Sequence, residues 1–159
     1  MLGNLIFALV FVAAIGSGVI GGVFFAFSSF VIAALARVAP DQGVAAMNAI
    51  NVTVINASFL TAFMGTALIC LVLMVCSFFW VDGTASQVIL AASLLYLMGT
   101  AGVTMMFNVP LNDQLAVVSH TEAATLWARY LKDWTMWNHV RTITSIAAAI
   151  LFTMALTVT

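Results

Sequence analysis

The stretch MLGNLIFALVFVAAIGSGVIGGVFFAFSSFVIAALA, residues 1–36, contains no charged side chain. Three more charge-free stretches follow it, at residues 42–81, 83–112 and 142–159. Each reaches or exceeds the roughly 18 apolar residues that make a helix a candidate for crossing a bilayer. We therefore predict an all-α integral membrane protein, a four-helix bundle with spans near residues 4–35, 54–79, 85–108 and 138–158.

The composition agrees with a lipid environment. Of the 159 residues, 65% are hydrophobic and only 6% are charged, whereas a soluble domain carries about a quarter charged residues. The spans leave no room for a second folding unit, so residues 1–159 are predicted to form one membrane domain. The net charge of −1 provides no basic surface for phosphates, so the expected partner is the lipid bilayer and not nucleic acid.

The basic residues of the loops predict an orientation. Arg37, Arg129 and Lys132 fall in the first and third loops, which share one side of a four-span protein, and the other side has no Lys or Arg. The positive-inside rule then places these loops in the cytoplasm and both termini outside, as expected in a bacterial inner membrane. Within the third loop, residues 121–131 read as a short interfacial helix, and Trp127, Trp134 and Trp137 are expected as interface anchors.

Small residues in the first span predict close helix packing. Gly18 and Gly22 form a GxxxG pattern, and Ser17 and Gly21 form a parallel stripe of small residues beside it. Such a face lets two helix backbones approach each other in lipid. A contact with another span of the same chain is the simpler interpretation. The same stripe also fits a contact between two copies of the chain, so a homo-oligomer stays open.

Polar residues converge on the predicted cytoplasmic side. Because polar side chains facing lipid are costly, those at the span ends should face one another or a cavity. At about 100° per residue, Trp134, Asn138, Arg141 and Ser145 fall on one stripe of the fourth span, and His139 lies roughly 100° away from it. The polar set at the span ends comprises Ser28, Ser29, Asn51, Asn108, Asn112, Asn138, His139 and Arg141.

Several of these residues belong to motifs of a known family. The sequence GVFFAFS at residues 22–28, Asn51, the NVPLN element at residues 108–112 and the WTMWNHVR element at residues 134–141 resemble the anthrone oxygenase-like membrane proteins. The resemblance covers nearly the whole chain in the same order. It implies a small four-span bundle and, from the activity of some fungal and bacterial relatives, oxidation of anthrones to anthraquinones with dioxygen. No metal or other cofactor is implied.

Applied to this sequence, the resemblance and the chemistry together nominate a site. An anthrone is a carbon acid, so His139 is the candidate base, while Arg141 with Asn138 or Asn108 would hold the developing oxyanion. The expected ligand is an apolar or aromatic small molecule. The candidate catalytic residues are His139, Arg141 and Asn138, and the candidate substrate-binding residues are Asn51, Asn108, Asn112, Trp137, Phe27 and Phe107.

Two other functions fit the same residues. The amide and arginine cluster would also suit a non-catalytic membrane protein that binds a lipid headgroup or a small apolar ligand. A haem-binding four-helix protein is the third hypothesis, since His139 and His120 fall on the same side of the membrane and haem in such bundles normally takes two axial ligands.

Overall fold

The computed structural model describes residues 2–157, and these residues form helices joined by short loops, with no strand among them. The predicted all-α class is therefore confirmed. Two long stretches contain π-helical turns, written η, that continue an α-helix without a break. In chain order the elements are α1 (Leu2–Ala26), η1 (Phe27–Val31), α2 (Ile32–Leu35), α3 (Pro40–Thr53), α4 (Ala57–Phe79), α5 (Gly83–Leu94), η2 (Leu95–Gly102), η3 (Thr104–Asn108), α6 (Val109–Ala116) and α7 (Ala123–Ala155).

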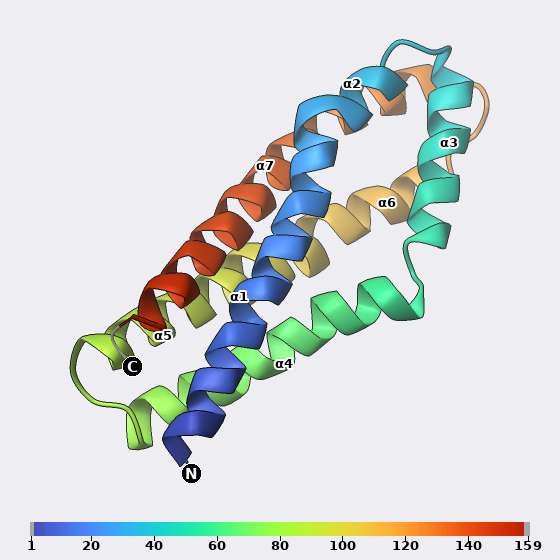
Figure 1. Cartoon of the computed structure of the whole chain (residues 1–159). Coiled ribbons are helices and arrows are strands. Elements are labelled where there is room, and N and C mark those ends of the chain that lie inside the picture. Colours follow the sequence, from blue (N-terminus) through green and yellow to red (C-terminus); the bar gives the residue numbers. More distant parts are fainter. Residues whose placement is uncertain (1, 158–159) are drawn as a thin grey trace.

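The long helices pack side by side into an elongated molecule (Figure 1). Helix α1 contacts both α4 and α7, and α5 contacts the same two helices. The beginning of α1, the turn between α4 and α5 and the end of α7 lie at one end of the molecule (Figure 1). At the opposite end, α3 contacts α6 and α7.

Three helical stretches are long and apolar enough to cross a membrane: Gly3–Leu35, Ala57–Phe79 and Gly83–Ala116. Many of their large apolar side chains are exposed, including Phe11, Leu68 and Met98, as expected for surfaces that face lipid and not water. Helix α7 is less apolar, because its first half carries Arg129, Lys132 and Asp133. It ends at Ala155, and residue 158, the predicted end of the fourth span, lies outside the described residues.

The second predicted span begins three residues later than expected. Residues 54–56 form a break, and Asn56 caps α4 by accepting a 3.0 Å hydrogen bond at Oδ1 from the backbone N–H of Phe59. Such a side-chain acceptor satisfies one of the free N–H groups in the first turn of a helix. The residues before the break form a separate helix, α3, which begins at Pro40.

The third predicted span, 85–108, is longer than expected. The helical stretch runs from Gly83 to Ala116 and passes through Pro110 without ending. Proline normally interrupts a helix because it lacks an N–H and its ring meets the carbonyl four residues earlier. Here the π-helical turn η3 lies immediately before α6, and Pro110 occupies the first turn of α6, where proline is tolerated.

The predicted short interfacial helix at residues 121–131 is not a separate element. Residues from Ala123 onward belong to α7, a single helix of 33 residues. The buried residues of this helix recur every three or four positions, which gives one continuous stripe along its whole length. They are Ala123, Trp127, Tyr130, Trp134, Asn138, Arg141, Thr142, Ser145, Ala148, Phe152 and Ala155.

The core has two parts. The first is a cluster of aliphatic and aromatic side chains between α1, α4, α5, η2 and the second half of α7. The second lies at the α3 end and contains Trp127, Tyr130 and Trp134, whose rings stack at centroid distances of 5.6 and 5.8 Å. Trp127 and Trp134 are therefore buried, and the prediction that they anchor the chain at a membrane interface is wrong.

Close helix contacts occur beside the predicted glycine pair and not at it. A Cβ on Gly22 would meet nothing within 4 Å, and one on Gly18 would only touch Ala149 at 4.0 Å. A Cβ on Gly21, by contrast, would lie 3.1 Å from Ile146 Cγ1 in α7. The expected packing within the chain is therefore found at Gly21, in the parallel stripe of small residues that Ser17 and Gly21 form.

Candidate functional site

A cavity of about 450 Å³ lies where the two parts of the core meet. Its walls come from α1, η1, α3, the α3–α4 break, α4, η3, α6 and α7, so it draws on nearly the whole chain. Most of the lining is apolar. The aromatic side chains of the lining are Phe24, Phe27, Phe59, Phe63 and Trp134. Apart from the indole N–H of Trp134, the polar groups of the lining belong to Asn51, Thr104, Asn112 and Arg141.

Arg141 is a buried cation in the wall of this cavity, with 4% of its surface exposed. Its Nη2 donates a 2.6 Å hydrogen bond to Asn138 Oδ1, and its Nη1 donates one of 3.3 Å to Thr104 Oγ1. The guanidinium carbon lies 4.1 Å from the ring centroid of Phe24 and 5.0 Å from that of Trp134. These contacts hold the guanidinium in place through neutral groups and aromatic faces.

No carboxylate neutralises Arg141 within residues 2–157, where the single ion pair joins Arg129 to Asp133. A buried charge without a partner is costly, and proteins normally pair it or place it where it binds a ligand. An arginine keeps its charge in nearly all protein environments. The guanidinium therefore gives the cavity a positive end.

Asn138 connects Arg141 to the first span. Its side chain is fully buried, and its Nδ2 donates hydrogen bonds to the backbone carbonyl of Phe24 at 2.8 Å and to Ser28 Oγ at 2.7 Å. Its Oδ1 accepts the bond from Arg141. Ser28 in turn lies 2.9 Å from Thr142 Oγ1. This network fixes α7 against η1 and sets the position of the guanidinium.

Three hydrogen-bond donors in the cavity lining have no partner. Asn51 Nδ2, Trp134 Nε1 and Arg141 Nε are all buried and unbonded. Unsatisfied buried polar groups are rare in folded proteins, and each one needs an explanation. All three residues line the same cavity, but the three N–H groups are shielded from water-sized molecules in this structure, so a ligand with acceptor oxygens would reach them after a small side-chain movement.

The asparagines of the NVPLN element have different positions. Asn112 lines the cavity and accepts a 2.7 Å hydrogen bond from the hydroxyl of Tyr130. Burial raises the pKa of this phenol above its usual range, so Tyr130 stays protonated and acts as a donor. Asn108 is fully buried behind the lining, where its Nδ2 donates to the carbonyl of Trp134 at 3.2 Å.

Three predicted site residues lie away from the cavity. His139 is exposed on the outer face of α7, and neither it nor the exposed His120 contributes to the lining. Trp137 and Phe107 stack on each other, with ring centroids 3.7 Å apart and planes 9° apart, also outside the lining. Of the predicted site residues, Phe27, Asn51, Asn112 and Arg141 line the cavity, while Asn138 and Asn108 lie outside the lining and bond its members Arg141 and Trp134. The geometry gives no support to His139 as a base or to Trp137 and Phe107 as walls.

Trp134 is the functional candidate that the sequence did not nominate as a ligand contact. The signal was present, because Trp134 shares the stripe of Asn138 and Arg141. A tryptophan near a span end was instead interpreted as an interface anchor. The π-helical turns also border the cavity, since η1 contributes Phe27 and η3 contributes Thr104 and Met105. Such turns are frequent at functional sites.

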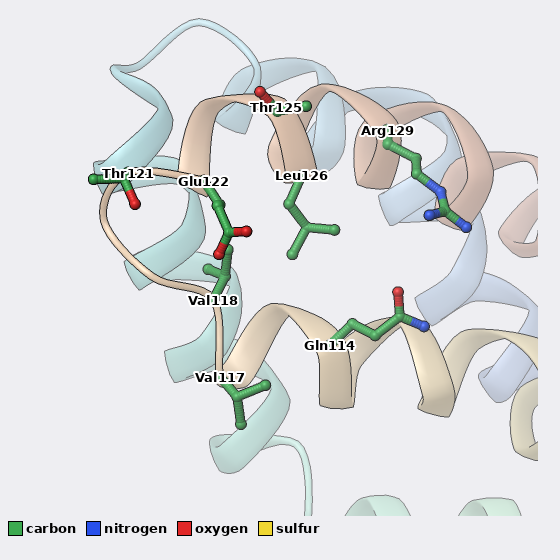
Figure 2. Close-up of a pocket in the computed structure, with 8 residues that line it drawn as sticks. All are labelled: Gln114, Val117, Val118, Thr121, Glu122, Thr125, Leu126 and Arg129. Carbon is green, nitrogen blue, oxygen red and sulfur yellow. The ribbon is translucent and has the colours of Figure 1, made fainter.

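A second hollow lies between α6 and the beginning of α7 (Figure 2). Gln114 and Arg129 flank it from the two helices, and Glu122 stands at its loop end (Figure 2). Its charged groups already have partners: Arg129 bonds Asp133 at 3.2 Å, and Glu122 accepts a bond from Ser119 at 2.6 Å. The hollow holds none of the predicted site residues, so the cavity at Arg141 is the better candidate.

Comparison with known families agrees with the motifs. Residues 55–151 match the family described as anthrone oxygenase. The chain belongs to the anthrone oxygenase family. The match includes α4, the third helical stretch and most of α7, and with them Thr104, Trp134, Asn138 and Arg141. Among the curated proteins and the solved structures there is no significant match.

The cavity includes residues from inside and outside the matched range. The part of the cavity contributed by the matched range contains the guanidinium and the indole N–H, while α1, η1 and α3 add Phe24, Phe27 and Asn51 from outside that range. The site is therefore complete only when the N-terminal helices pack onto the matched region.

Proposed function

We propose that this protein is a four-span membrane bundle that oxygenates an anthrone-like polycyclic aromatic with dioxygen. The observation that carries the proposal is the uncompensated guanidinium of Arg141, which lines an aromatic cavity together with two further unpartnered N–H donors. In this proposal α7 is the fourth span. The loop that carries Arg37 and the first half of α7, which carries Arg129 and Lys132, lie on the cytoplasmic side of a bacterial cell membrane, and a C-terminal reporter fusion should show the termini outside.

The dimensions and chemistry of the cavity suit such a substrate. Its volume of about 450 Å³ falls within the range of roughly 300–1,000 Å³ that is typical of small-molecule sites. Phe24, Phe27 and Phe63 offer flat apolar surfaces to a fused ring system. A carbonyl oxygen on that ring system would meet the N–H donors of Arg141, Trp134 and Asn51.

The role of Arg141 is to stabilise the substrate anion. Loss of a proton from the CH₂ group of an anthrone leaves a carbanion that shares its charge with the ring ketone oxygen. A fixed guanidinium beside that oxygen, in a cavity of low polarity, favours the anion and so lowers the pKa of the bound carbon acid. No histidine or carboxylate lines the cavity in the described part of the chain, so the proton passes to a base in the aqueous solution outside the cavity.

The oxidation then proceeds between the substrate anion and dioxygen. The anion transfers one electron to dioxygen, and the resulting radical pair combines to form a C–O bond and a peroxide. Loss of the second C–H proton with cleavage of the O–O bond leaves a new carbonyl and releases water. Anthrone and dioxygen thus give anthraquinone and water, and one oxygen atom of dioxygen enters each product.

Turnover in a defined bilayer tests the proposal. The protein in lipid nanodiscs should convert anthrone to anthraquinone faster than empty nanodiscs do, and ¹⁸O₂ should place one labelled atom in the quinone. A rate equal to that of the empty nanodiscs would overturn the oxygenase function. If anthraquinone still bound, the chain would be a non-catalytic binder of aromatic ligands, as the absence of a side-chain base in the lining would allow.

His139→Gln is expected to keep activity within about twofold of the wild-type value. The side chain is exposed and lies outside the cavity, and general-base catalysis requires the base to lie within hydrogen-bond reach of the proton. The measurement is kcat/KM for anthrone in nanodiscs. A loss of a hundredfold or more would return His139 to the mechanism.

Trp134→Phe is expected to weaken ligand binding about three- to tenfold, which is the effect of losing one hydrogen bond. Phenylalanine keeps an aromatic ring beside the guanidinium but removes the unpartnered Nε1 donor. Binding of anthraquinone, measured by equilibrium dialysis against nanodiscs, checks this. Phe59→Leu, which alters an aromatic wall without removing a donor, serves as the comparison, and an equal loss in both variants would argue against a role for the indole N–H.

A further inference from the structure

The cavity reaches the surface of the protein through an apolar mouth. Four of its lining residues are exposed, namely Ile55, Leu60, Met64 and Met105, with exposed fractions of 69%, 40%, 56% and 63%. All four are apolar, whereas the polar lining residues are less exposed: Arg141 and Trp134 are each only 4% exposed, and Asn51, Thr104 and Asn112 are half-buried. The cavity is therefore polar at its buried end and apolar at its opening.

The mouth lies between α4 and η3. Leu60 and Met64 are one turn apart on α4, and Met105 belongs to η3. Helix α4 packs against α5 and η2, whereas α4 and η3 have few or no contacts with each other. The two helical stretches separate toward α3 (Figure 1), and the opening lies where they separate.

Both sides of the mouth belong to helices that are apolar enough to cross a membrane. Leu60 and Met64 lie in the stretch Ala57–Phe79, and Met105 lies in Gly83–Ala116. An exposed apolar rim at that depth is solvated by acyl chains. Methionine side chains are flexible and unbranched, so they can make way for a passing ring system.

From this placement we infer that the opening between α4 and η3 is the entrance through which the ligand passes sideways from the hydrocarbon of the bilayer into the cavity. The inference rests on the proposed function, because it assigns the entrance to an apolar polycyclic dissolved in the membrane. Such a molecule meets apolar side chains at the mouth and polar groups only inside the cavity. The carbonyl of the ligand enters ahead of the ring body and reaches the buried, polar end of the cavity. The ring body then fills the apolar part near the mouth.

The test is the rate at which anthraquinone binds to the protein in nanodiscs without turnover. Stopped-flow quenching of tryptophan fluorescence follows binding, since Trp134 lines the cavity. Met105→Trp places a large ring at the mouth. Met106→Trp is its matched control, because Met106 is 69% exposed, adjacent in sequence and absent from the lining. Both variants carry one additional tryptophan, so their signals are comparable.

We expect Met105→Trp to slow association about tenfold, because an obstructed path lowers the association rate constant. Dissociation should slow to a similar extent, so the equilibrium affinity should change little. Met106→Trp should bind within twofold of the wild-type rate. A second pair, Met64→Trp with Leu68→Trp as its control, repeats the comparison on α4, where Leu68 is 63% exposed and outside the lining.

Three outcomes would contradict the inference or its premise. Equal association rates in mouth and control variants would overturn the entrance. A weaker affinity with an unchanged association rate would also overturn it, since Met64 and Met105 would then be binding contacts. Failure of the wild-type protein to bind anthraquinone at all would instead overturn the proposed substrate class, and with it the ligand assigned to the entrance.

Discussion

Arg141→Met is expected to lower kcat/KM for anthrone by about a hundredfold or more. Removing one preorganised donor from an oxyanion site commonly costs 10²–10³ in rate, and Arg141 is the cation in a lining that is otherwise neutral. Methionine fills much of the same volume and removes the charge. The substrate anion would then lose the guanidinium that favours it over the neutral form. The measurement is steady-state turnover in nanodiscs with the background oxidation of anthrone subtracted.

Arg141→Lys separates the charge from the geometry. An ammonium keeps the positive charge but lacks the planar set of donors that bonds Asn138 and Thr104 and leaves Nε free. We expect activity between that of the wild type and that of the methionine variant. The methionine variant should also be at least as stable as the wild type, because it no longer buries an unpaired charge. Unchanged turnover in Arg141→Met would remove the cavity from the mechanism.

Asn138→Leu is expected to reduce the free energy of unfolding by about 2–4 kcal/mol, the sum of hydrogen bonds that each contribute on the order of 1 kcal/mol. The substitution removes the bonds from Asn138 to the Phe24 carbonyl and to Ser28, and the bond that Asn138 accepts from Arg141. The guanidinium would be left with a single weak partner, Thr104. Activity should fall as well, because the position of Arg141 depends on this amide.

Unfolding in mixed micelles, followed by circular dichroism, measures the loss. Thr153→Val is the matched control, since Thr153 lies on the same helix, is exposed and bonds only the carbonyl of Ala149 within that helix. It should change stability by less than about 0.5 kcal/mol, as surface substitutions do. If Asn138→Leu were as stable as the control, the amide network would not hold α7 to the first span.

The sequence was sufficient to predict the helical class and the apolar stretches, because long charge-free runs are a strong signal. It also predicted that Trp134, Asn138, Arg141 and Ser145 share a face, and all four are buried. Helical periodicity alone carries that information, and it also placed His139 off the stripe. The exposed position of His139 is the physical consequence of that angle.

Other features depended on contacts between distant segments. The helical stretch continues past Pro110 through the π-helical turn η3 and then α6, and π-helical turns are too rare to be expected from a sequence. The walls formed by Phe24, Phe59 and Phe63 follow from how α1 and α4 pack together. Residues 123–131 belong to α7, and Trp127 in this part packs against Gly43 in α3, where a Cβ would lie 2.7 Å from the indole. That contact joins residues 84 positions apart.

The unbroken buried stripe of α7 restricts how this chain can change in length. One line of side chains begins among stacked aromatic rings, passes through Asn138 and Arg141, and ends among small and aromatic residues near Ala155. A single inserted or deleted residue within this stripe would rotate all later side chains of the helix by about 100°. Either the guanidinium or the α7 side chains of one of the two core clusters would then face the outer surface. Insertions and deletions during evolution must therefore fall in the loops, while this helix keeps a fixed residue count between its aromatic beginning and its arginine.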